Sequence, residues 1–176
     1  MPLPISFYAR DAETVAIALL GTTLVFENKR LRIVETEAYV GVHDLACHAA
    51  RGRTKRTEVM FGPPGRAYIY LIYGMYELFN VVTGDDGDAQ AVLIRAAEPL
   101  SNITRTTDGP GKLTLALGLT RAYNAHDLTG PPLTLEAGTP PEAVVTTTRV
   151  GIDYAGAWKD APLRFYDAGS RHVSRR

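Results

Sequence analysis

Tyrosine side chains are concentrated in one segment of the chain. Five of the nine tyrosines lie between Tyr39 and Tyr76. Tyrosine combines an apolar ring face with a hydroxyl that needs a hydrogen-bond partner when it is buried. Nucleic-acid bases are flat and partly polar, and stacking one on an aromatic side chain is worth about 1–3 kcal/mol. The segment therefore predicts a pocket that grips a flat, partly polar ligand.

One carboxylate and one guanidinium accompany these rings. Glu37 is expected at a strand end, beside Tyr39 and before Gly41, where a side chain can be held and still face a cleft. Arg95 interrupts an apolar run, and a buried arginine is rare unless it is paired. Pairing of the two would keep Glu37 ionised, as a general base must be. From these residues alone, a surface glutamate and a structural ion pair remain open.

Other catalytic arrangements have little support. His43, Cys47 and His48 lie close together, but no second Cys/His pair of metal-ligand spacing follows, so packing or hydrogen-bonding roles are favoured. No Ser-His-Asp arrangement and no phosphate-binding glycine loop of recognised spacing is present. No lysine has the apolar context of a Schiff-base nucleophile. The four lysines are Lys29, Lys55, Lys112 and Lys159.

Composition limits the class of protein. The 176 residues fit one domain, with 45% hydrophobic and 22% charged residues. Nineteen basic and nineteen acidic side chains cancel, which counts against a nucleic-acid partner because phosphate contacts dominate that affinity. The basic residues are nevertheless clustered, for example at 51–56, so a polarised surface and solvated charge runs are both open.

Cysteine content and the N-terminal sequence suggest a compartment. Cys47 is the only cysteine, so no intrachain disulfide forms and a reducing compartment is favoured. Residues 1–4 lack the basic start and apolar run of a signal peptide. No apolar segment approaches the roughly 18 residues of a membrane helix. We expect a soluble, cytoplasmic protein with no membrane partner.

The hydrophobic pattern predicts the elements that position these residues. Residues 11–20 have the capping signals of a helix. Residues 31–39 alternate as a strand, which would place Leu31, Ile33, Glu35, Glu37 and Tyr39 on one face. Residues 67–73 and 76–83 predict a hairpin, or a sharply bent strand, around Gly74. The other expected elements are a short helix at 44–51, a turn at 84–88, a strand at 91–97 that completes an antiparallel meander, a loop at 101–111, a helix at 113–119, and strands at 144–151 and 162–166.

Several ordered motifs resemble the alkyladenine (3-methyladenine) DNA glycosylase family. They are Glu35-Thr-Glu-Ala-Tyr39, His48, Tyr68-Ile-Tyr-Leu-Ile-Tyr-Gly-Met-Tyr76, Asn80, Val92-Leu-Ile-Arg-Ala-Ala-Glu-Pro-Leu100, Arg149-Val-Gly-Ile152 and Pro162-Leu-Arg-Phe-Tyr166. The resemblance runs from about residue 7 to residue 171, and it favours the catalytic interpretation of Glu37. It implies a single α+β domain over residues 1–176, built on a curved, barrel-like antiparallel sheet flanked by short helices.

The resemblance implies a monofunctional glycosylase of base excision repair, acting as a monomer on double-stranded DNA that contains damaged purines. It would flip an alkylated or deaminated purine out of the duplex and hydrolyse its N-glycosidic bond with an activated water. No metal or other cofactor would be needed, because a cationic purine leaves readily. The preference among 3-methyladenine, 7-methylguanine, hypoxanthine and ethenoadenine stays open.

The resemblance also implies catalytic and DNA-opening roles. Glu37 would deprotonate the attacking water. Arg95 and the main-chain carbonyl of Val150 would help to hold that water. Tyr73, before Gly74, would fill the gap left in the DNA stack, and Met75 and Tyr76 would line the groove beside it.

Four further residues are implied to bind the flipped base. Tyr39 and Tyr70 would sandwich it. His48 would close the pocket and contact the purine edge through its main chain, and Asn80 would crowd the exocyclic amine of normal guanine. Two functions of other classes remain open: a non-catalytic module that holds RNA or DNA, and a hydrolase of free nucleosides.

Overall fold

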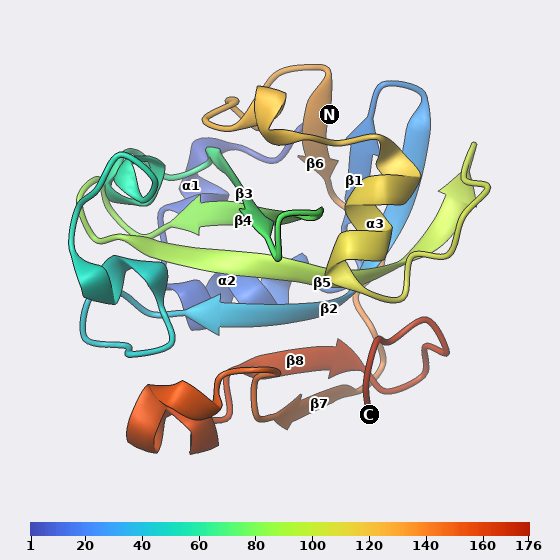
Figure 1. Cartoon of the computed structure of the whole chain (residues 1–176). Helices are drawn as coiled ribbons and strands as arrows, with labels where there is room; N and C mark the ends of the chain where they lie inside the picture. The colour runs from blue at the N-terminus through green and yellow to red at the C-terminus, as the bar shows by residue number, and fades with distance from the viewer.

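Eight strands form one curled antiparallel sheet in the computed structural model, which describes residues 1–176 (Figure 1). Strand order is β3-β4-β5-β2-β1-β6, and β8 pairs with both β2 and β7. The strands are β1 (Thr23–Phe26), β2 (Lys29–Tyr39), β3 (Ala67–Ile72), β4 (Tyr76–Thr83), β5 (Gln90–Ser101), β6 (Leu133–Glu136), β7 (Val144–Thr147) and β8 (Arg164–Asp167). This single α+β domain with a half-barrel sheet confirms the expected fold class.

Short helices flank the sheet. The α-helices are α1 (Ile5–Tyr8), α2 (Ala12–Leu19) and α3 (Pro110–Leu117), and the 3-10 helices are η1 (His48–Arg51), η2 (Glu58–Phe61), η3 (Arg121–Tyr123) and η4 (Asp153–Asp160). The helix predicted at 11–20 is confirmed as α2, and the Asp11 carboxylate caps it by accepting from the Thr14 amide at 2.9 Å. None of the helices combines the length and apolar character needed to cross a bilayer.

The two faces of the sheet have different surroundings, because successive side chains of a strand point to opposite faces. On β3, Ala67 and Ile69 belong to the main hydrophobic core, as do Phe79 of β4 and Val92 of β5. Helix α2 packs on this face against β2 and β5 (Figure 1). The tyrosines of β3 alternate with these core residues and therefore lie on the opposite face.

Irregular pairing in β2 changes which of its side chains face the core. The prediction that residues 31, 33, 35, 37 and 39 share one face is wrong. Leu31 and Ile33 belong to the main core, but so does Ala38, whereas Glu37 and Tyr39 line a cavity on the other face. The register between β2 and β5 shifts on both sides of Glu35. Because an extra residue in a strand exchanges the two faces downstream, this bulge turns Glu37 away from the core.

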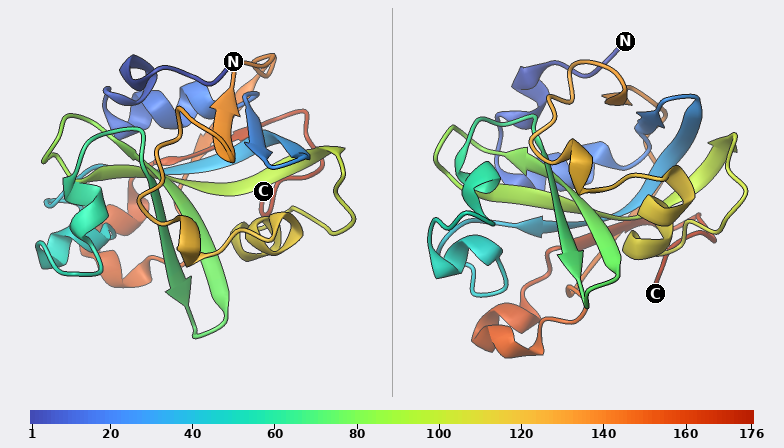
Figure 2. Two further views of the ribbon diagram at one scale, coloured as in Figure 1. Left: turned by 90° about the horizontal axis from the view of Figure 1, so that it is seen from above. Right: turned by 45° about the horizontal axis from the view of Figure 1, so that its top comes forward.

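The β3–β4 hairpin confirms the prediction around Gly74 and projects from the rest of the sheet (Figure 2). Tyr73 and Gly74 have φ angles of +53° and +67°, and the Met75 amide donates to the Ile72 carbonyl at 3.2 Å. A left-handed backbone at a non-glycine residue costs about 1–3 kcal/mol and is concentrated at functional sites. The turn presents Tyr73 with 85% of its surface exposed.

Several other predicted bounds are corrected. Strand β5 continues through Pro99 to Ser101. Since β4 pairs with β5 only as far as Leu93, one edge is unpaired there, where proline is tolerated. Helix α3 begins at Pro110, a favourable first position. Only residues 48–51 of the helix expected at 44–51 are helical, as η1. Elements that were not predicted are α1, β1 and β6, each of four residues, and the 3-10 helices η2, η3 and η4.

Candidate active site

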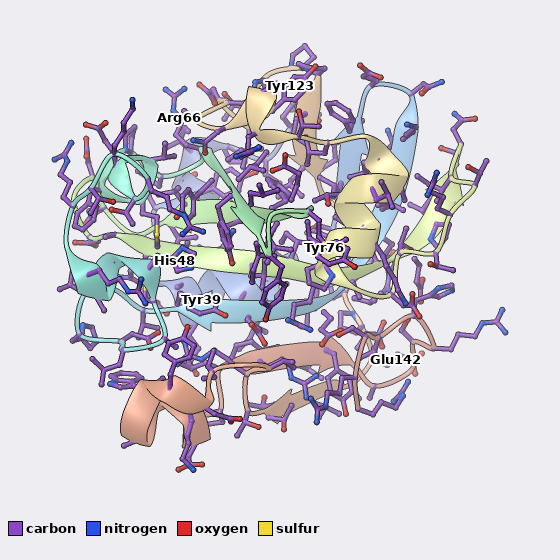
Figure 3. All side chains as sticks on the ribbon, in the orientation of Figure 1. Tyr39, His48, Arg66, Tyr76, Tyr123 and Glu142 are labelled. Atoms are coloured by element: carbon purple, nitrogen blue, oxygen red, sulfur yellow. The ribbon has the colours of Figure 1, made fainter.

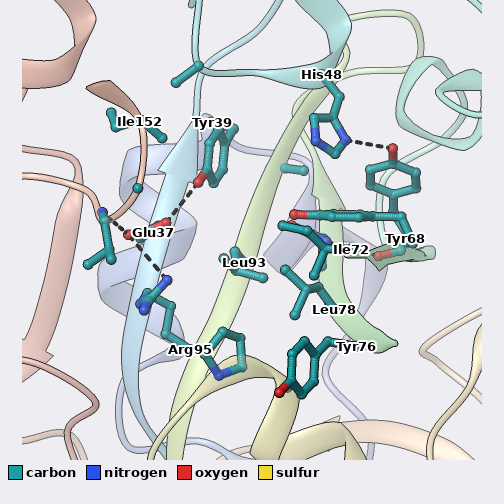
Figure 4. A pocket seen from close by; sticks show the side chains of 18 of the residues that line it. Glu37, Tyr39, His48, Tyr68, Ile72, Tyr76, Leu78, Leu93, Arg95 and Ile152 are labelled. Carbon is teal, nitrogen blue, oxygen red and sulfur yellow. Dashed lines mark hydrogen bonds and ion pairs between the residues drawn. The ribbon is translucent and has the colours of Figure 1, made fainter. Parts of the chain in front are cut away.

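A cavity of about 500 Å³ lies on the tyrosine-bearing face of the sheet (Figure 4). This volume is within the range of about 300–1,000 Å³ found for ligand pockets. Its walls come from β2, β3, β4 and β5, from the start of α3 and from residues 150–154. All but one of the residues to which the sequence gave a role line it, and they are Glu37, Tyr39, His48, Tyr70, Tyr73, Tyr76, Asn80, Arg95 and Val150. Met75 is the exception.

Cross-strand pairing brings distant parts of the chain together. Tyr68 pairs with Asn80, Asn80 with Leu93, and Leu93 with Glu37. These four residues form one cross-strand row over β3, β4, β5 and β2, and all four line the cavity. Directly opposed side chains on one face of an antiparallel pair lie about 4.5–5.5 Å apart. The row therefore places a carboxylate at one end and a phenol at the other.

Glu37 is fully buried and holds two hydrogen bonds (Figure 4). Its Oε1 accepts from the Tyr39 hydroxyl at 2.8 Å, and its Oε2 accepts from the Val150 amide at 2.7 Å. Arg95 Nη1 lies 3.7 Å from Oε2. Val150 thus contacts Glu37 through its N–H, a contact that the sequence did not predict.

Electrostatics at Glu37 combine burial with four compensating groups. Burial raises the pKa of Glu37 above its ordinary value, while the Arg95 guanidinium, the Val150 amide, the Tyr39 hydroxyl and the Arg149 guanidinium oppose that rise. Desolvation disfavours a buried carboxylate, and hydrogen bonds or cations favour it. A raised pKa makes a carboxylate a stronger base, which is the property needed to take a proton from water.

An ion pair behind Tyr39 fixes one wall of the cavity. The buried Arg149 guanidinium donates to both oxygens of Asp44, at 2.6 and 3.0 Å. It also lies 4.9 Å from the centroid of the Tyr39 ring, within cation–π range. Asp44 accepts from the amides of Val40 and Ala46 as well. This ion pair connects the loop after β2 to the segment that carries Val150.

His48, Tyr68 and Tyr70 form the opposite wall. His48 Nδ1 and the Tyr68 hydroxyl are 2.9 Å apart, and the His48 and Tyr70 rings meet edge to face with centroids 4.4 Å apart. Burial, with smaller contributions from Arg56 and Arg51, lowers the pKa of His48 to about 4. Burial raises the pKa of Tyr68 to about 12. Both side chains are therefore neutral at pH 7.

The remaining predicted residues lie at the floor and the rim. Asn80 is buried, and its Nδ2 donates to the Tyr68 carbonyl at 3.2 Å. Tyr76, labelled with Tyr39 and His48 in Figure 3, lines the same cavity, and its ring packs against Gly111 at the start of α3. Met75 lies outside the cavity at the hairpin tip, with 67% of its surface exposed.

Comparison with known proteins identifies the family. A family model described as methylpurine-DNA glycosylase matches residues 6–171. The chain is 58% identical over 182 residues to a protein of Myxococcus xanthus, covering 98% of this chain and 93% of that protein. This chain belongs to the methylpurine-DNA glycosylase family. It is therefore a DNA glycosylase of DNA repair, a hydrolase of N-glycosyl bonds, and the resemblance found in its motifs is confirmed.

Other relatives match over almost the whole chain. A protein of Anaeromyxobacter dehalogenans is 54% identical, covering 99% of this chain and 86% of its own length. A protein of Legionella pneumophila is 48% identical, covering 98% of both chains. All three relatives are provisionally named 3-methyladenine DNA glycosylases.

Proposed function

We propose that the protein flips alkylated or deaminated purines out of double-stranded DNA and hydrolyses their N-glycosidic bond, acting as a monomer and as one domain over residues 1–176. One observation carries the proposal. Glu37 is a buried carboxylate that faces a cavity of about 500 Å³ between tyrosine walls. A purine fits such a space, and a base inside a duplex can enter it only when it leaves the stack.

In the proposed reaction, a water attacks C1′ of the deoxyribose while Glu37 accepts its proton. The bond between C1′ and N9 breaks, and its electron pair leaves with the purine. Arg95 and the main chain of Val150 help to position the water. For a cationic purine such as 3-methyladenine, the departing pair neutralises the ring, so the leaving group needs no further proton. Neutral hypoxanthine would leave as an anion and take a proton from solvent.

Aromatic contacts would hold the flipped base and the opened duplex. Tyr39 and Tyr70 would stack on its two faces, and His48 would close the pocket beside them. Asn80 would exclude normal guanine by crowding its exocyclic amine. Tyr73, exposed at the hairpin tip, would fill the gap in the stack, with Met75 in the groove beside it.

The proposed step needs no metal or other cofactor, and we place the enzyme with the DNA of the cytoplasm. A monofunctional enzyme is supported by Lys112, which lines the cavity at the start of α3. Its side chain is 60% exposed and pairs with Asp108 at 3.3 Å. An exposed amine paired with a carboxylate lacks the apolar, desolvated surroundings that a Schiff-base nucleophile needs.

The test is base release from duplexes that carry one hypoxanthine or one 7-methylguanine. We expect release of the free base and an abasic strand that is cut only after alkali treatment. Binding without release would support the binding module instead. Release from free nucleosides but not from duplex DNA would support a nucleoside hydrolase, and a strand cut without alkali would refute the monofunctional mechanism.

A further inference from the structure

A second buried carboxylate lies on β2, next to the proposed base. Glu35 is fully buried. Its Oε1 accepts from Arg164 Nη1 at 2.9 Å, from the Ser174 hydroxyl at 2.9 Å and from Arg95 Nε at 3.3 Å. Its Oε2 accepts from the Ser174 amide at 2.6 Å. Four donors on a group outside the reaction indicate that Glu35 organises its neighbours.

Arg95 has a different partner at each of its three nitrogens. Nε donates to Glu35, and Nη2 donates to the Ser174 hydroxyl at 3.3 Å. Nη1 faces Glu37 at 3.7 Å, which is an ion-pair distance and too long for a hydrogen bond. Glu35 and Ser174 therefore hold one edge of the guanidinium while the other edge points at Glu37.

We propose that Glu35, together with Ser174, is a positioning pair that keeps Arg95 from closing onto Glu37. The inference rests on the proposed role of Glu37 as the base. A guanidinium that hydrogen-bonded Glu37 directly would stabilise its ionised form and occupy the oxygen that the water needs. Restraint by Glu35 leaves Glu37 a stronger base and leaves Arg95 Nη1 available to the water.

The other groups around Glu37 do not contact Glu35. They are Tyr39 on β2, Tyr70 on β3, and Arg149 and the Val150 amide in the segment after β7. Arg164, on β8, binds Glu35 rather than Glu37. Two carboxylates and two guanidinium groups balance in this cluster. A change at Ser174 therefore alters the position of Arg95 without altering the charge or the other contacts of Glu37.

The test is the pH dependence of single-turnover excision of hypoxanthine by Ser174→Ala. The released guanidinium should move toward Glu37, so the acid limb of the rate profile should shift to lower pH by about half a pH unit or more. The plateau rate should fall by about tenfold, less than the about 10²-fold that a 1 Å misplacement can cost. Ser174→Thr, which keeps the hydroxyl, should restore both values. Ser101→Ala, at the far end of β5, is the matched control and should behave as the unmodified protein.

If Ser174 has only a structural role, its replacement should lower the rate equally at every pH and leave the acid limb of the rate profile unshifted. That result would overturn the inference. Glu35→Gln provides a second measurement, since it removes the competing charge and should shift the limb in the same direction and further. If both variants fold and neither shifts the acid limb of the rate profile, the proposal that Glu35 and Ser174 position Arg95 is refuted. The proposed function fails differently: the unmodified protein would then release no base at any pH.

Discussion

Glu37→Gln distinguishes the role of Glu37 as general base from the structural roles of the same side chain. Glutamine has nearly the same shape. Its carbonyl oxygen can accept from the Val150 amide, and its NH₂ group can donate to the Tyr39 oxygen, so both positions of the present hydrogen bonds stay filled. Arg95 loses an ion pair at 3.7 Å but keeps Glu35. The substitution also removes a charge that is costly to bury. We expect the free energy of unfolding to change by no more than about 1 kcal/mol.

Excision should respond very differently. Loss of a general base costs about 10²–10⁴-fold in rate, which corresponds to about 3–5 kcal/mol in the activation barrier. Because the tyrosine walls are unchanged, the Kd for a duplex with one hypoxanthine should stay within about twofold. Single-turnover base release and fluorescence anisotropy measure the two quantities. The control is Glu142→Gln, an exposed glutamate far from the cavity (Figure 3). Excision within tenfold of the unmodified rate would remove Glu37 from the mechanism.

Three further substitutions test the walls and the rim. Tyr39→Phe keeps the ring but removes a donor that stabilises ionised Glu37. The pKa of Glu37 should therefore rise further and the acid limb of the rate profile should move to higher pH; a shift to lower pH would contradict the assigned hydrogen bond. Asn80→Ser should make guanine release from undamaged DNA detectable, and undetectable release would refute the steric argument. Tyr73→Ala should leave Tm unchanged, because the residue is 85% exposed, while excision from duplex DNA falls. Unimpaired excision would show that Tyr73 does not fill the gap in the DNA stack.

Local sequence signals were sufficient for part of the fold. The β3–β4 hairpin was predictable because alternating residues flank Gly74, and α2 was predictable from the Asp11 cap. The short elements β1 and β6 were not, since four residues carry too little pattern to distinguish a strand from a loop. The face of Glu37 was also not predictable. It depends on how β2 pairs with β5, a tertiary property that no window of β2 alone contains.

In the site too, some residues could be predicted from local motifs and others could not. Motifs were sufficient to select Glu37, Tyr39, Asn80 and Arg95, and the structure places all four around one cavity. Arg149 and Asp44 were given no role, because they meet across more than one hundred residues of sequence. A role for Glu35 had some support in the sequence. A second glutamate in a strand of the core is unusual, since glutamate is almost never fully buried unless it is paired. Its partner Ser174 lies 139 positions away.

The placement of the site on the sheet rather than on loops has a mechanical consequence. The cross-strand row of Tyr68, Asn80, Leu93 and Glu37 is held by the backbone ladders of four strands, and sites on strands are more precise than sites on loops. His48, the first residue of η1, and Val150, which follows β7, lie outside these ladders. Their positions depend on the buried ion pair between Asp44 and Arg149, whose rupture would leave an uncompensated charge at a cost of about 3–5 kcal/mol. The sheet therefore fixes the position of Glu37. The ion pair determines whether the segments that carry His48 and Val150 complete the pocket around it.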